Sequence, residues 1–141
     1  MKVQVLYFSK AGNATTVGDG ITRHLKCKQD AIPPAYPAEN EKIVFVGIDY
    51  TGKTDKKLMD FCRTLTPART ANVAFYAVSK NDTSDVSAYK SAVAANGVNV
   101  VDDVYTVNGG AAGFFGAFNK KISLDERRGI VNWVTSTIEA L

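Results

Sequence analysis

The residues with the clearest chemical potential lie together near the N-terminus, in the segment Ser9, Lys10, Ala11, Gly12, Asn13, Ala14 and Thr15. Two of them carry hydroxyl groups and one an amide, and Gly12 lets the backbone approach a ligand closely. If this segment joins a strand to a helix, the free N–H groups of the first turn and the helix dipole favour an anion such as a phosphate. The same residues would also suit an ordinary tight turn with a helix N-cap.

The flanking sequence predicts the required strand and helix. Residues 2–8 (KVQVLYF) are rich in β-branched and aromatic types, which indicates a short buried strand. Val17, Ile21 and Leu25 recur at helical spacing and predict an amphipathic helix over residues 13–26. The segment from Ser9 to Thr15 is therefore expected to be a strand-to-helix loop.

The rest of the chain continues the alternation of strands and helices. Further strands are expected at a short edge around residues 31–32, at 42–48, at 71–78 and at 98–107, and further helices around 58–65, 86–95 and 123–141. Such alternation is typical of a parallel sheet with helices on both faces. We predict a single α/β domain over residues 1–141, a three-layer sandwich whose five strands lie in the order 2-1-3-4-5, the second being short.

Composition excludes several classes of protein. The net charge is +3, with 17 basic and 14 acidic residues scattered along the chain, which does not indicate nucleic-acid binding. No apolar run approaches the roughly 20 residues of a membrane span, and the N-terminus lacks signal-peptide features. The two cysteines, Cys27 and Cys62, form no metal-binding motif and are expected to be reduced thiols of a cytoplasmic protein.

Residues 7–21 (YFSKAGNATTVGDGI) resemble the phosphate-binding loop of flavodoxins. Ser9, Gly12 and Asn13 match that pattern directly. Ala11 and Ala14 depart from it and remove two hydroxyls, although their backbone N–H groups are expected to remain available. The resemblance covers nearly the whole chain and implies the flavodoxin-like fold with flavin mononucleotide (FMN) as cofactor.

A second and a third loop extend the resemblance. Residues 44–61 (VFVGIDYTGKTDKKLMDF) are similar to the family's third strand, flavin-facing loop and following helix, which assigns Asp49, Tyr50, Thr51 and Gly52 to the cofactor site. Tyr50 is the candidate to pack on the flavin ring, its alternative being a tyrosine at the edge of the core. The loop after the next strand implies backbone contacts to the pyrimidine edge from Ser79, Lys80, Asn81 and Asp82.

The resemblance implies an electron carrier that needs no catalytic residue or metal and exchanges electrons with larger redox proteins. Lysines near the expected site predict partners with acidic docking surfaces: Lys10, Lys53, Lys56, Lys57 and Lys80. A carrier is favoured over an enzyme with its own substrate, but a small FMN-dependent reductase stays open. So does a flavodoxin-like binding module with weakened or lost flavin binding. The glycine- and phenylalanine-rich residues 108–120 would cover a ligand, meet a partner or anchor the loop on the core.

Overall fold

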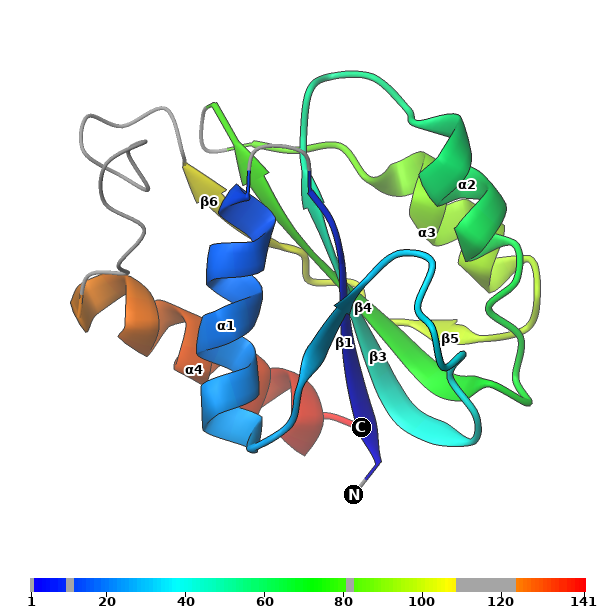
Figure 1. Cartoon of the computed structure of the whole chain (residues 1–141), viewed down its shortest axis with the longest axis horizontal. Helices are drawn as coiled ribbons and strands as arrows, with labels where there is room; N and C mark the ends of the chain where they lie inside the picture. The colour runs from blue at the N-terminus through cyan, green and yellow to red at the C-terminus, as the bar shows by residue number, and fades with distance from the viewer. Residues whose placement is uncertain (1, 10–11, 81–82, 109–123) are drawn as a thin grey trace.

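The computed structural model describes residues 2–9, 12–80, 83–108 and 124–141, and strands and helices alternate along most of them (Figure 1). The strands are β1 (Val3–Phe8), β2 (Gln29–Ala31), β3 (Glu41–Asp49), β4 (Thr70–Ser79), β5 (Asn99–Val100) and β6 (Tyr105–Asn108). The helices are α1 (Asn13–Leu25), α2 (Lys56–Cys62), α3 (Ser87–Ala94) and α4 (Leu124–Glu139). The bounds predicted from the sequence for β1, α1, β3 and β4 are confirmed to within one residue at each end.

The strands form one parallel sheet in the order β2-β1-β3-β4-β5, with β6 also paired to β4. The predicted order is confirmed, but the last strand, expected to run unbroken over residues 98–107, is divided. Its two pieces pair with successive stretches of β4, and the exposed Asp102 and Asp103 lie between them. Lys90 Nζ donates a 2.7 Å hydrogen bond to the Asp102 carbonyl, so this carbonyl has a side-chain partner between the two pieces of the strand.

Helices cover both faces of the sheet, α1 and α4 on one and α2 and α3 on the other (Figure 1). Alternate residues of β3 point to opposite faces. Val44 and Val46 join the core beneath α2 and α3, whereas Ile43 and Phe45 join the core beneath α1 and α4. No helix in the described ranges is long and apolar enough to cross a membrane.

The carboxyl ends of β1 and β3 lie side by side. Their register pairs Phe8 with Ile48, so the next residues, Ser9 and Asp49, meet at the edge of the sheet. The strand order also reverses direction between these two strands, and in open α/β sheets this is where ligands bind. The fold therefore brings together two segments that the sequence separates by forty residues.

Candidate functional site

The loop between β1 and α1 turns sharply at Gly12. This residue is the N-cap of α1 and has a φ of 86°, in the left-handed region that favours glycine. Its N–H donates a 2.9 Å hydrogen bond to Ser9 Oγ, and its carbonyl accepts a 3.1 Å bond from Thr16 Oγ1. The Thr16 hydroxyl is thus directed back to the helix backbone, while Ser9 closes the turn.

The carboxylate of Asp49 lies at the N-terminus of α1. Ser9 Oγ donates a 2.6 Å hydrogen bond to its Oδ2, and the Ala14 N–H donates a 2.8 Å bond to its Oδ1. The helix has no acidic residue in its own first turn, and its N-cap makes no side-chain hydrogen bond. Asp49, contributed by β3, therefore provides the negative charge that stabilises the start of α1.

This arrangement corrects one expectation about the loop. The Ala14 N–H was expected to be available to a phosphate, but it is engaged by Asp49. Asp49, which was assigned to the flavin-facing loop, is the last residue of β3 and contacts Ser9 and Ala14. A signal in the sequence supports this position: Asp49 directly follows the apolar run of residues 42–48, which was predicted to be the strand beside β1.

The rest of the second loop runs along the same edge. Tyr50 is half-buried, its N–H donates a 2.8 Å hydrogen bond to the Val78 carbonyl, and its side chain packs against the core beneath α2 and α3. A small cavity of about 60 Å³ lies beside it and is bordered by Phe8, Asp49 and Tyr89 among others. Thr51 and Gly52 are exposed, and Gly52 has a φ of 86°. The core contact matches the alternative interpretation of Tyr50, while its place beside Asp49 keeps it at the candidate site.

Asp55 fixes the far end of this loop, a role that the sequence analysis did not assign. Its Oδ1 accepts hydrogen bonds of 2.8 Å from Lys57 N and 3.3 Å from Leu58 N, which caps α2. Its own N–H donates a 2.7 Å bond to the Tyr89 hydroxyl oxygen. Burial raises the pKa of Tyr89, which favours the protonated hydroxyl. An aspartate one residue before a helix is the sequence signal for such a cap.

The third loop is described in part. Ser79 is the last residue of β4 and is buried, whereas Lys80 is exposed. Four of the predicted site residues, Lys10, Ala11, Asn81 and Asp82, lie outside the described residues, as does nearly all of the segment 108–120. The described site thus consists of Ser9, Gly12 and the first turn of α1, the end of β3 with residues 50–55, and the end of β4.

The donors around Asp49 have the geometry of an anion site and no metal-binding character. Within the described ranges, no group of three or more histidine, cysteine or acidic side chains is placed to hold a metal ion. A helix N-terminus at the point where the strand order reverses, carrying hydroxyl and N–H donors, suits a phosphate group. The sheet order and the position of this loop are those of a flavodoxin-like fold.

Comparison with solved structures agrees with this class. The chain is similar to oxidised flavodoxin 2 from Bacillus cereus, with a TM-score of 0.65 and 12% identity over 100% of both chains. It is also similar to two-electron-reduced flavodoxin from Megasphaera elsdenii, with a TM-score of 0.58 and 15% identity over 92% of this chain and 96% of that one. No family model and no curated protein sequence matches the chain. At this level of identity, the likeness establishes the fold.

Proposed function

We propose that this protein binds FMN and carries electrons in the manner of a flavodoxin. The observation that carries the proposal is the convergence of the Ser9 hydroxyl and the Ala14 N–H on the two carboxylate oxygens of Asp49. These donors already hold an anion, and the oxygens of a phosphate group accept the same kind of hydrogen bond. The two solved structures that the fold resembles are flavodoxins in an oxidised and a two-electron-reduced form.

The residues present fit a flavin phosphate on one condition. Ser9, Ala14 and the first turn of α1 would hold the phosphate, and Asn13 at the start of the helix offers a side-chain amide. Because two anions at one helix N-terminus repel each other, Asp49 must give up its hydrogen bonds to this loop when a phosphate enters. Tyr50 would contact the ring from the neighbouring loop. FMN, when bound, supplies the electron-transfer chemistry.

The same observation favours a second candidate, a flavodoxin-like binding module without flavin. In that case Asp49 permanently replaces the phosphate and stabilises the start of α1. The two candidates differ in one measurable property, which is whether a phosphate can displace the carboxylate.

Exposed lysines at this edge support the proposed partners, and the two free cysteines support the proposed compartment. Lys53, Lys57 and Lys80 are exposed, while Lys56 is also exposed but pairs with Asp60 at 3.7 Å. A larger redox protein with an acidic docking surface would be attracted to this edge. Both cysteines are free thiols, which accords with the cytoplasm as the proposed location.

The experiment is a titration of the flavin-free full chain with FMN and with riboflavin, followed by flavin fluorescence. We expect FMN to bind about tenfold or more tightly than riboflavin, because only FMN adds charge-assisted hydrogen bonds from its phosphate. Equal affinity for the two flavins would place the phosphate elsewhere. Absence of binding by both would exclude the carrier and leave the flavin-free module.

A further inference from the structure

The connection from β2 to β3 contains no helix. Residues 32–40 cross from one side of β1 to the other as a loop with three prolines, Pro33, Pro34 and Pro37. Crossovers between parallel strands usually contain a helix that packs on the sheet. Here the loop and α2 leave a groove between them instead, and its volume is about 620 Å³. Small-molecule sites usually measure roughly 300–1,000 Å³.

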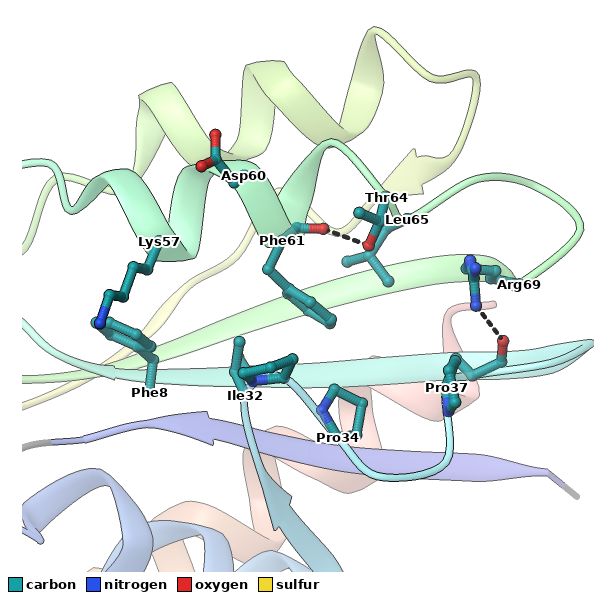
Figure 2. Close-up of a pocket in the computed structure, with 12 residues that line it drawn as sticks. Phe8, Ile32, Pro34, Pro37, Lys57, Asp60, Phe61, Thr64, Leu65 and Arg69 are labelled. Carbon is teal, nitrogen blue, oxygen red and sulfur yellow. Dashed lines mark hydrogen bonds between the residues drawn. The ribbon is translucent and has the colours of Figure 1, made fainter.

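The walls of this proline groove are apolar. Figure 2 shows the Phe61 ring and the Leu65 side chain extending from α2 and the segment after it toward Ile32 and Pro34 of the loop. Phe8, from the end of β1, closes one end of the groove. Because proline restricts its own backbone, the loop wall is stiff before any ligand arrives. The groove therefore offers a preformed surface for an apolar body.

Two cations lie at opposite ends of the proline groove (Figure 2). Arg69 is half-buried, and its Nη1 donates a long hydrogen bond of 3.5 Å to the Ala38 carbonyl. A guanidinium has five N–H donors, so the group retains capacity for a carboxylate. Lys57, at the end near Phe8, is exposed and forms no ion pair with the described residues.

The one acidic residue among those that border the groove does not neutralise these charges. The Asp60 side chain points away from the groove (Figure 2) and is paired with Lys56 at 3.7 Å and with Arg63 at 3.3 Å. The groove is thus apolar along its walls and positive at its ends. This combination selects a ligand that has an apolar body and an anionic head.

We propose that the proline groove binds a small amphipathic carboxylate of the size of a medium-chain fatty acid. Its carboxylate pairs with Arg69, which is the more buried of the two cations and has the planar donor geometry that a carboxylate matches. Its apolar chain lies between Phe61 and the prolines of the loop. The groove adjoins the candidate FMN site, because Phe8 borders both, but the proposal rests on Arg69, Phe61 and the prolines and does not depend on the proposed function.

The test is calorimetric titration of the full chain with decanoate and, as the uncharged counterpart, with 1-decanol. We expect decanoate to bind about tenfold or more tightly than 1-decanol. Arg69→Gln should lower decanoate affinity about tenfold and leave that for 1-decanol unchanged, and Arg69→Lys should restore part of the loss. Arg23→Gln, which changes an exposed arginine of α1 on the other face of the sheet, is the matched control and should change the affinity less than about threefold. Equal affinity of wild type and Arg69→Gln for decanoate would overturn the assignment.

Amide chemical shifts locate the ligand independently of any variant. A second hollow of about 680 Å³ adjoins the proline groove and extends to Ser9; the residues that line both are Phe8, Ile32, Pro33, Lys57 and Asp60. Decanoate in the groove should shift the amide signals of Thr64 and Leu65, which border only the groove, and leave those of Ser9 and Gly12 in place. Shifts confined to Ser9 and Gly12 would show that the carboxylate occupies the helix N-terminus and would refute the proposal. Near-UV circular dichroism of each variant confirms that it is folded.

Discussion

Gly47 of β3 lies directly opposite Tyr76 of β4, and the tyrosine ring occupies the space where a side chain at Gly47 would be. A Cβ atom added to Gly47 would overlap the ring carbons of Tyr76. The tyrosine is fully buried in the core beneath α1 and α4, and burial raises its pKa. Gly18 of α1 is close to the same residue, since a Cβ there would lie 2.8 Å from the Tyr76 hydroxyl. The large ring is accommodated by two glycines.

The first prediction tests that fit. Gly47→Ala should lower the free energy of unfolding by about 1–3 kcal/mol, because the added methyl group overpacks the core against the Tyr76 ring. Chemical denaturation measures this loss. The cost should be smaller in a Tyr76→Leu background, where the ring is absent. An equal cost in both backgrounds would show that the ring is not the obstacle.

The second prediction concerns the carboxylate at the start of α1. Asp49→Asn should raise FMN affinity about tenfold and leave riboflavin affinity unchanged, since it removes the negative charge that competes with the phosphate. Asp60→Asn, which changes an exposed carboxylate on α2, is the control and should have little effect. Fluorescence titration of the three proteins measures the difference. Weaker FMN binding by Asp49→Asn would mean that Asp49 organises the loop for the phosphate instead of competing with it.

The third prediction uses the left-handed backbone of Gly12. Asp and Asn are both tolerated in this conformation, so Gly12→Asp and Gly12→Asn carry similar strain and differ in charge. Calorimetry should show about tenfold weaker FMN binding for Gly12→Asp than for Gly12→Asn, because a second carboxylate at the helix N-terminus repels a phosphate. If the two variants bind FMN equally, the phosphate does not enter this loop.

The fourth prediction concerns the aromatic ring beside the site. Tyr50→Ala should weaken FMN binding by about 1 kcal/mol or more, because it removes the face on which the flavin ring would pack. Tyr50→Phe retains that face and should bind FMN as the wild type does. Quenching of flavin fluorescence reports the contact. Wild-type quenching in Tyr50→Ala would identify Tyr50 as a residue of the core edge, consistent with its packing.

The fifth prediction follows from the buried thiol. Cys62 is buried, and burial raises the pKa of its thiol to about 12. Cys27 is half-buried, and burial raises its pKa in the same direction. At pH 8, alkylation should modify Cys27 first and reach Cys62 only after unfolding.

The protonated thiol of Cys62 is favoured in the folded state, so its contribution to stability is complete below about pH 9 and is lost as the pH rises towards 12. Chemical denaturation between pH 8 and pH 10.5 should show that the free energy of unfolding falls more steeply with pH in the wild type than in Cys62→Ala.

The order of the elements could be predicted from the sequence because its signals are local. The apolar run of residues 42–48 has the length and composition of a strand buried on both faces, and the helical spacing of Val17, Ile21 and Leu25 marks α1. Parallel strands joined by right-handed crossovers can be arranged in few strand orders, so the order 2-1-3-4-5 could be predicted from the alternation of strands and helices. The division of the last strand was not predicted, because valines surround Asp102 and Asp103 and the hydrogen bond from Lys90 is not visible in the sequence.

The sequence by itself determined the order of the elements in the sheet and the position of the β1–α1 loop, since these depend on residue types at close spacing. Only the tertiary structure decided which group the loop holds and where a ligand-sized groove lies. Asp49 reaches Ser9 across forty positions because β1 and β3 are paired in register, and the proline groove exists because residues 32–40 form a loop without a helix. Both depend on contacts between segments that are distant in the chain, and local residue patterns carry no record of such contacts.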